Sequence, residues 1–236
     1  MGTMEREQAL RRGQLILKNA TNRRHARTLL FIGCLAIIAL LAPAWLGSKE
    51  SDSQAKPDAR MRGNPRAPIT LVEYSDFTCG FCQKFFHETL PRIQAQYIET
   101  GKIRFFYRDF PRSSQGPSVN AAVAARCAGD QDRYWPMHDQ LFSGGRLEPV
   151  EFQRHAKTIG LDMLAFTKCL RDAHHTEAIF RDKEDGIGLG LRGTPGFLLF
   201  LTEGATKEPA ILIPGAFPFQ VFEEQIDRLL KIAMQK

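Results

Sequence analysis

Two cysteines separated by two residues form the most reactive group of side chains in this sequence. Cys79 and Cys82 follow a short apolar run at residues 69–74 and open a helical pattern that extends over residues 81–99. At the N-terminus of a helix, backbone N–H groups and the helix dipole stabilise a thiolate, the form of cysteine that attacks disulfides. The spacing and the position predict a reversible disulfide that takes part in thiol–disulfide exchange.

The two cysteines have different expected roles. Cys79 lies nearer the end of the helix and is the expected nucleophile, whereas Cys82 lies one turn inside and is the expected resolving cysteine. The two-residue period of a strand puts Glu73 on the same face as residues 69 and 71, so we expect a buried carboxylate below the disulfide. Such a carboxylate exchanges a proton with Cys82, while a strand glutamate that reaches solvent is the alternative.

A structural zinc site is the main alternative for the cysteine pair. Such a site needs four ligands, usually in two close pairs, and the sequence has no second C-x-x-C or C-x-x-H. Cys127 and Cys169 are isolated, and no histidine lies within three residues of either. His174 and His175 are adjacent, but one histidine pair does not make a metal site. The sequence predicts neither a metal nor a bound cofactor.

A long apolar segment precedes the cysteine pair. Residues 28–48 contain no charged side chain and are about long enough to cross a bilayer as a helix. Residues 1–27 hold seven basic and two acidic residues, and positive flanks remain in the cytoplasm. We therefore expect a retained transmembrane anchor at 28–48, with the chain after it on the far side of the membrane. A cleaved signal peptide, with a small-residue site at 42–44, is the alternative.

The distribution of charge argues against nucleic acid as a partner. The formal net charge is +6, of which residues 1–27 contribute +5 and the remaining chain +1. The part after the anchor therefore has no charge excess for binding a polyanion. Residues 49–66 lack large apolar side chains except Met61 and are expected to form a flexible linker. Residues 67–236 are long enough for one domain with a sizeable core.

The hydrophobic pattern of this domain predicts an α/β fold. Strands are expected at 69–74 and 103–107, a helix between them at 81–99, a hairpin at 197–201 and 210–213, and a last helix at 219–233. A helical insertion spans about 116–190, with segments expected at 118–128, 132–142, 149–159, 162–173 and 175–185. Ser118 and Asp162 are expected N-caps, and Pro149 suits a first helical turn.

Several stretches resemble the DsbA-like family of thiol–disulfide oxidoreductases, which have a thioredoxin fold with a helical insertion. The resemblance covers about residues 66–234. It rests on VEYSDFTCGFC at 72–82, RDFP at 108–111, AAVAARCA at 121–128, YWPMHDQLF at 134–142 and GTPGF at 193–197. It implies that Pro195, after Thr194, forms a cis peptide bond beside the active-site disulfide. Together with Phe81, this loop is expected to contact substrate. Gly196 departs from the larger residue often found after this proline.

The residues between the cysteines bear on the type of exchange. Phe81 has no group that donates a hydrogen bond to a thiolate, so we expect Cys79 to be less acidic than in the strongest oxidants. The Gly80–Phe81 pair resembles the Gly-Tyr pair of disulfide isomerases, but those carry an N-terminal dimerisation domain that the short polar linker does not provide.

We therefore expect a membrane-tethered, extracytoplasmic enzyme that oxidises thiols in cysteine-containing exported proteins. The implied location is a bacterial inner membrane with a periplasmic catalytic domain, and a membrane redox partner resets Cys79 and Cys82. A reductase or isomerase of the same fold is the first alternative, and a non-catalytic peptide-binding module is the second.

Cys127 and Cys169 lie on apolar faces of two helices in the same helical block. In an oxidising compartment, two neighbouring buried thiols tend to pair, so a structural disulfide is one expectation. Two buried free thiols are the alternative.

Overall fold

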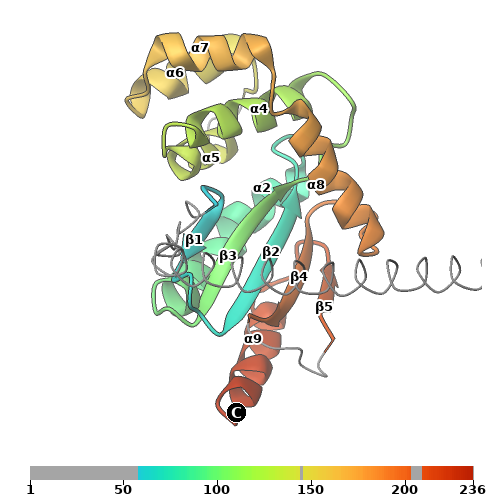
Figure 1. The fold of residues 1–236 in the computed structure, drawn as a ribbon. Coiled ribbons are helices and arrows are strands. Elements are labelled where there is room, and N and C mark those ends of the chain that lie inside the picture. The colour runs from blue at the N-terminus through green and yellow to red at the C-terminus, as the bar shows by residue number, and fades with distance from the viewer. Residues whose placement is uncertain (1–57, 144–145, 203–208, 236) are drawn as a thin grey trace, which may run out of the picture. The chain divides into compact units, whose positions relative to one another are not determined.

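A five-stranded sheet forms the centre of the described chain, in the order β1-β3-β2-β4-β5 (Figure 1). The structure is a computed structural model, and it describes residues 58–143, 146–202 and 209–235. The strands are β1 (Met61–Gly63), β2 (Ile69–Ser75), β3 (Ile103–Asp109), β4 (Gly196–Leu201) and β5 (Ile211–Pro214). The four strands expected from the sequence are all present, with bounds that differ by at most two residues.

Strand pairing places three chain segments at one end of the sheet. β2 and β3 are parallel, so both end at the same edge, with Ser75 opposite Asp109. β4 is antiparallel to β2 and begins at that edge, where Gly196 lies opposite Tyr74. The segments that leave β2, leave β3 and enter β4 therefore meet there.

The helical segment after β2 is continuous but irregular. It consists of α2 (Gly80–Lys84), the π-helical η2 (Phe85–Thr89), α3 (Leu90–Ile93) and the π-helical η3 (Gln94–Ile98). The pattern at 81–99 predicts the helix but not these wider turns. Pro91 lies in the first turn of α3, directly after η2. Because proline has no N–H to donate, a regular hydrogen-bond ladder cannot continue through it.

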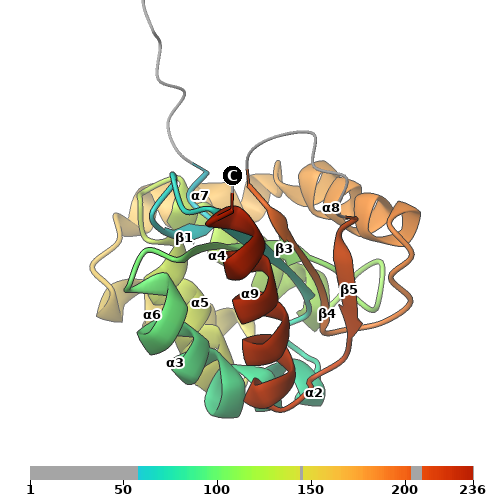
Figure 2. The same cartoon turned by 90° about the horizontal axis from the view of Figure 1, so that it is seen from below.

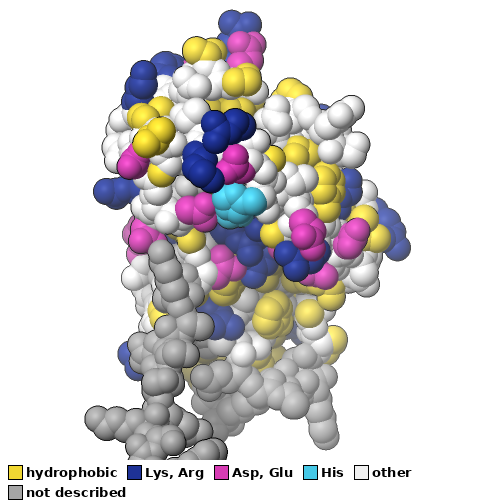
Figure 3. Space-filling view, turned by 45° about the horizontal axis from the view of Figure 1, so that its top comes forward, with side chains coloured by type: hydrophobic (Ala, Val, Ile, Leu, Met, Phe, Trp, Pro, Cys, Tyr) yellow, Lys and Arg dark blue, Asp and Glu magenta, His cyan; other side chains and the backbone are white. Residues whose placement is uncertain are grey.

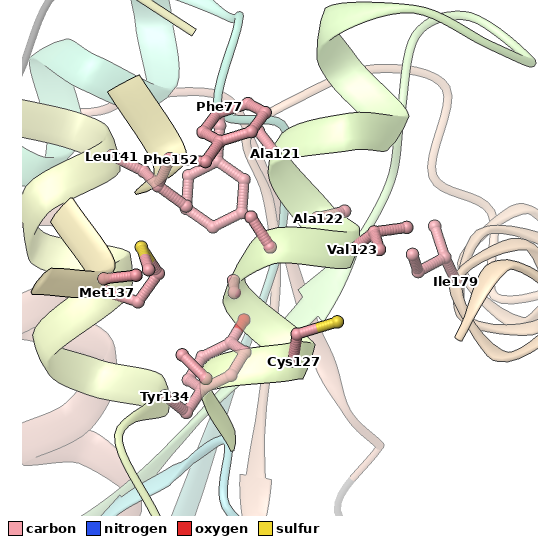
Figure 4. Close-up of a cluster of buried hydrophobic side chains, with 14 of the residues drawn as sticks. Phe77, Ala121, Ala122, Val123, Cys127, Tyr134, Met137, Leu141, Phe152 and Ile179 are labelled. Carbon is pink, nitrogen blue, oxygen red and sulfur yellow. The ribbon is translucent and has the colours of Figure 1, made fainter. Parts of the chain in front are cut away.

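The insertion between β3 and β4 contains five described helices. These are α4 (Pro117–Gly129), α5 (Tyr134–Ser143), α6 (Pro149–Thr158), α7 (Met163–Asp172) and α8 (Thr176–Gly188). Figure 4 shows their shared core, in which Ala121, Ala122 and Val123 of α4 lie between Met137 of α5 and Ile179 of α8. Small alanine side chains on α4 let the neighbouring helices approach closely on several sides.

The predicted helix ends are confirmed in two cases and wrong in one. The Asp162 carboxylate accepts hydrogen bonds from the backbone N–H groups of residues 164 and 165, so it is the N-cap of α7. Pro149 lies in the first turn of α6. Ser118 is not the N-cap of α4, because that position is Gly116 and the Ser118 hydroxyl donates to Asp76 instead.

Helices cover both faces of the sheet. The last helix, α9 (Phe219–Ala233), has the bounds expected from the sequence and crosses one face beside α3 (Figure 2). Its Phe222 ring lies 5.5 Å from the Phe85 ring and 4.9 Å from the Phe197 ring, measured between centroids. On the other face, a Cβ atom at Gly186 of α8 would lie 2.8 Å from the Tyr74 ring, so glycine permits this close packing.

The predicted linker extends too far toward the folded domain. Strand β1 lies within residues 49–66 and pairs antiparallel with β3, with Met61 opposite Phe106. Asp58, before it, pairs with Arg60 and Arg108. The prediction was wrong for 58–66 because β1 is held by backbone pairing and ion pairs rather than by a run of apolar side chains.

The predicted cytoplasmic segment at 1–27 and the predicted transmembrane span at 28–48 lie outside the described residues. Within 58–143, 146–202 and 209–235, no helix combines the length and apolar character needed to cross a membrane.

Candidate active site

Cys79 lies between the end of β2 and the start of α2. It occupies the N-cap position with extended backbone angles, φ −85° and ψ 119°, and its carbonyl accepts the N–H of Gln83 at 3.0 Å. Cys82 lies inside α2 and is fully buried, whereas Cys79 is 8% exposed. Both are free thiols in this structure, which therefore represents the reduced pair. The three-residue separation puts one sulfur at the helix start and the other against the core.

Asp76 organises the turn that carries Cys79. One carboxylate oxygen accepts the backbone N–H and the hydroxyl of Thr78, each at 2.8 Å. The other oxygen accepts the Arg112 backbone N–H at 2.8 Å and the Ser118 hydroxyl at 2.6 Å. This buried carboxylate thus ties the cysteine turn to the segment after β3 and to the start of α4. No role was predicted for Asp76, although Asp-Phe-Thr has the spacing of a side-chain-capped turn.

The loop before β4 lies beside Cys79. The Thr194–Pro195 peptide bond is cis. The Cys79 thiol donates to the Thr194 carbonyl oxygen, with 3.4 Å between sulfur and oxygen. The loop is held here because Gly196 begins β4 directly opposite Tyr74 at the end of β2. A Cβ atom at Gly196 would overlap the Leu191 side chain, which accounts for glycine at this position.

A row of buried polar side chains runs along the sheet below Cys82. In the register of β2 and β3, Glu73 pairs with Tyr107 and Ser75 pairs with Asp109, so these four side chains share one face. All four are at most 2% exposed. The burial of Glu73 agrees with the expectation from strand alternation, and the solvent-exposed alternative is excluded.

The comparisons with known proteins agree with this arrangement. A family model described as thioredoxin matches residues 55–200, which is more than half of the chain. The chain belongs to the thioredoxin family. The probable disulfide bond formation protein D of Bacillus cereus is 23% identical over 176 residues, covering 70% of this chain and 82% of that protein.

Another relative is much longer than this chain. The Na(+)/H(+) antiporter NhaA 1 of Salinispora arenicola is 33% identical over 141 residues, which are 59% of this chain. The chain spans about a fifth of the length of this antiporter, because the matched region is 21% of it.

The solved structures identify the branch of this thioredoxin family. The crystal structure of alpha-DsbA1 from Wolbachia pipientis has a TM-score of 0.67 and 28% sequence identity, covering 74% of this chain and 92% of that one. The predicted DsbA-like fold, a thioredoxin fold with a helical insertion, is confirmed.

The surroundings of this thioredoxin-type pair lower the pKa of one thiol and raise the pKa of the other. A hydrogen bond from the Cys82 thiol lowers the pKa of Cys79, burial opposes this, and the Thr194 side chain and the N–H groups of residues 81 and 82 lower it further. Burial raises the pKa of the Cys82 thiol, and its hydrogen bond with Cys79 acts in the same direction. At neutral pH the arrangement favours a thiolate at Cys79 and a protonated thiol at Cys82.

Glu73 is uncharged near neutral pH. Burial raises its pKa from 4.5 to about 8, and the nearby Ser75 side chain acts in the opposite direction. A carboxylic acid with a pKa near the working pH suits both the release and the uptake of a proton.

An open groove of about 410 Å³ lies beside Thr194. Its walls combine apolar and basic side chains, namely Phe110, Ile187 and Leu191 with Arg112, Lys183 and Arg192. Phe81, between the two cysteines, is 67% exposed and stands in solvent next to them. Phe77, in the turn before Cys79, is buried against Tyr107, with 5.2 Å between ring centroids.

The remaining two cysteines form a disulfide away from this site. Cys127 of α4 and Cys169 of α7 are bonded, with 5.8 Å between their Cα atoms. Of the two alternatives that the sequence left open, a disulfide and two free buried thiols, the structure has the disulfide, which joins two helices of the insertion.

Proposed function

We propose that this protein is a thiol–disulfide oxidoreductase that forms disulfides in cysteine-containing exported proteins. The observation that carries the proposal is the asymmetry of the pair, with a stabilised thiolate at Cys79 and a buried, protonated Cys82. A stabilised thiolate favours the reduced form of the pair. The corresponding disulfide is then a stronger oxidant, which favours oxidase activity.

The reaction begins with the disulfide form of the pair. A substrate thiolate attacks the Cys79 sulfur, so a substrate–Cys79 bond forms while the Cys79–Cys82 bond breaks and Cys82 leaves as a thiolate. The protonated Glu73 carboxyl supplies the proton that Cys82 needs. A second substrate thiolate then attacks the substrate sulfur of the mixed disulfide, and Cys79 leaves as the stabilised thiolate. The substrate gains one disulfide, and the pair gains two electrons.

We assign substrate binding to the surface around Cys79. An extended peptide that reaches Cys79 passes the Thr194–Pro195 loop, because the Thr194 carbonyl contacts the Cys79 sulfur. The groove next to this loop has room for side chains of the peptide, and its basic rim favours acidic ones. Phe81 offers an exposed apolar surface for unfolded segments.

We further propose that residues 28–48 anchor the protein in a bacterial inner membrane, with the catalytic domain on the periplasmic side. The uncharged apolar segment and the basic residues before it support this topology. A membrane redox partner then reoxidises the pair after each turnover. Exported proteins fold in the same compartment, where disulfides persist.

The alternative directions of electron flow differ in a measurable potential. A pair that equilibrates with glutathione near about −120 mV acts as an oxidant, whereas a value near about −270 mV is that of a reductase. We expect a value well above −270 mV. The second alternative, a non-catalytic peptide-binding module, has no need for two free thiols with opposite pKa shifts.

The roles of the two cysteines are tested in full-length protein with a reduced, unfolded substrate. Cys79→Ser should abolish exchange, and Cys82→Ser should accumulate mixed disulfides that mass spectrometry detects at Cys79. Cys34→Ser is the control, because Cys34 belongs to the predicted membrane segment and should leave exchange unchanged. Release of substrate by Cys82→Ser at the wild-type rate contradicts the proposed roles.

A further inference from the structure

A second cluster of reactive side chains lies in the helical insertion, beside the Cys127–Cys169 disulfide. Asp130 is the C-cap of α4, and His174 and His175 connect α7 to α8. One carboxylate oxygen of Asp130 lies 2.9 Å from Nε2 of His175 and 3.6 Å from Nε2 of His174. With the Cys169 sulfur, these ligand atoms all lie within 4.8 Å of one another.

The fold holds this cluster together without a bound ion. The disulfide joins α4 to α7, and Asp130 and His174 follow its two cysteines after short stretches of chain. Ala173 ends α7 with a φ of +47°, which turns the chain sharply into the histidine pair. The two imidazole rings lie 4.1 Å apart between centroids. Little chain entropy would therefore be lost when an ion binds.

The distances suit a tetrahedral transition-metal ion. Zinc bonds of about 2.0–2.2 Å to nitrogen and oxygen place neighbouring tetrahedral ligand atoms about 3.4 Å apart. The separations of 2.9 and 3.6 Å lie on either side of this value. Two imidazoles and one carboxylate favour zinc over calcium or magnesium, which prefer oxygen ligands alone.

The exposure of the cluster also suits a cation. The side chains of His174 and Asp130 are 55% and 47% exposed, so an ion enters directly from solvent. The face in Figure 3 carries histidine side chains with acidic and basic side chains beside them.

We propose that Asp130, His174 and His175 form a Zn²⁺ site with water in the fourth position. Cys169 adds no thiolate, because its sulfur is held in the disulfide with Cys127. The site is separate from the exchange centre: His175 lies at the N-terminal end of α8, whereas the Thr194–Pro195 loop follows its C-terminal end. The 13 residues of α8, a helix about 20 Å long, lie between the two in the chain. Zinc there crosslinks α4 to the α7–α8 connection and stabilises the insertion by mass action.

The test is calorimetric titration of ZnCl₂ into full-length protein in detergent, with Cys127–Cys169 oxidised. A Cys79→Ser/Cys82→Ser background removes the thiol pair, which would itself bind zinc. We expect one equivalent of zinc per chain. His175→Ala and Asp130→Asn should each weaken binding at least tenfold. His87→Ala is the matched control, since His87 is an exposed histidine of η2 and should leave the affinity unchanged.

The absorption spectrum of bound Co²⁺ provides a second readout that does not depend on folding stability. A four-coordinate site gives intense visible bands, and these should disappear in His175→Ala while circular dichroism stays unchanged. Absence of binding up to millimolar zinc overturns the proposal. Equal affinity in His175→Ala and in the background protein indicates an adventitious ion only, and it overturns the proposal as well.

Discussion

Replacing Glu73 by glutamine removes a buried ionisable group from beneath the cysteine pair while nearly preserving its shape. In the folded protein the pKa of Glu73 is about 8, compared with 4.5 for an ordinary glutamate. The folded state therefore binds a proton that the unfolded state has lost between these two pH values. The stability contributed by this proton is complete below pH 4.5 and is lost as the pH rises through about 8.

The size of the effect follows from the interval between the two pKa values. Within this interval, each rise of one pH unit lowers the free energy of unfolding by about 1.4 kcal/mol. From pH 4.5 to pH 7 the wild type therefore loses about 3 kcal/mol that Glu73→Gln does not lose. Cys79 has a lowered pKa and acts with the opposite sign, stabilising the reduced protein as the pH rises toward its ordinary value. That contribution is common to both proteins and largely cancels in their difference.

The assay is urea unfolding of the reduced, full-length proteins at pH 4.5, 6 and 7. Relative to wild type, Glu73→Gln should gain about 3 kcal/mol between the first and the last pH. Glu88→Gln is the matched control, because the Glu88 side chain is 59% exposed and pairs with Lys84 at the surface. Its difference from wild type should stay within about 0.5 kcal/mol.

Glu73→Gln should also oxidise a dithiol substrate more slowly, by about a hundredfold, because it cannot donate a proton to Cys82. A variant that is more stable at pH 7 and yet slower identifies a group retained for its chemistry. If the difference in unfolding free energy between Glu73→Gln and wild type changes as little with pH as that of Glu88→Gln, the assignment of a protonated buried carboxyl is refuted.

Three further outcomes can be measured on the same protein. Cys127→Ala/Cys169→Ala should lower the free energy of unfolding by about 4 kcal/mol, because the bond closes a 42-residue separation; a loss below about 1 kcal/mol contradicts this. Arg126→Met leaves the buried Asp109 carboxylate without its guanidinium at 2.6 Å and should destabilise by about 3–5 kcal/mol at pH 7, measured by urea unfolding. An alkaline carbonate wash should leave the full-length protein in the membrane pellet, whereas a soluble form that begins just after residues 42–44 indicates cleavage.

The elements with a strong hydrophobic period could be predicted from the sequence. The helix α9 has its predicted bounds because its apolar residues recur at helical spacing throughout. Strand β1 was missed because its pairing with β3 uses backbone groups, which leave no pattern in a stretch with one large apolar residue. The π-helical turns on either side of Pro91 were missed because apolar residues at helical spacing do not distinguish π-helical from α-helical turns.

Some residues of the candidate active site could be predicted from the sequence, and others could not. The two cysteines and Glu73 could be assigned from spacing and strand alternation, which are local properties. Asp76 could not, because its four hydrogen bonds join residues up to 42 positions away. The histidine pair had no predicted ligand partner because Asp130 lies 45 positions before His175 and reaches it only through the packing of α4 against α7.

The different roles proposed for the two thiols follow from their separation by three residues on one helix. In the proposed reaction, substrate reaches the Cys79 sulfur at the helix start, and hydrogen bonds to this sulfur stabilise it as a leaving thiolate. Cys82 faces the buried row that begins at Glu73, so the sulfur that must regain a proton is the one beside a carboxylic acid. Exchanging these surroundings would bury the nucleophile away from substrate and leave the other sulfur without a proton donor. In the proposed mechanism, the position of the pair relative to the end of β2 therefore sets the direction of attack before any substrate binds.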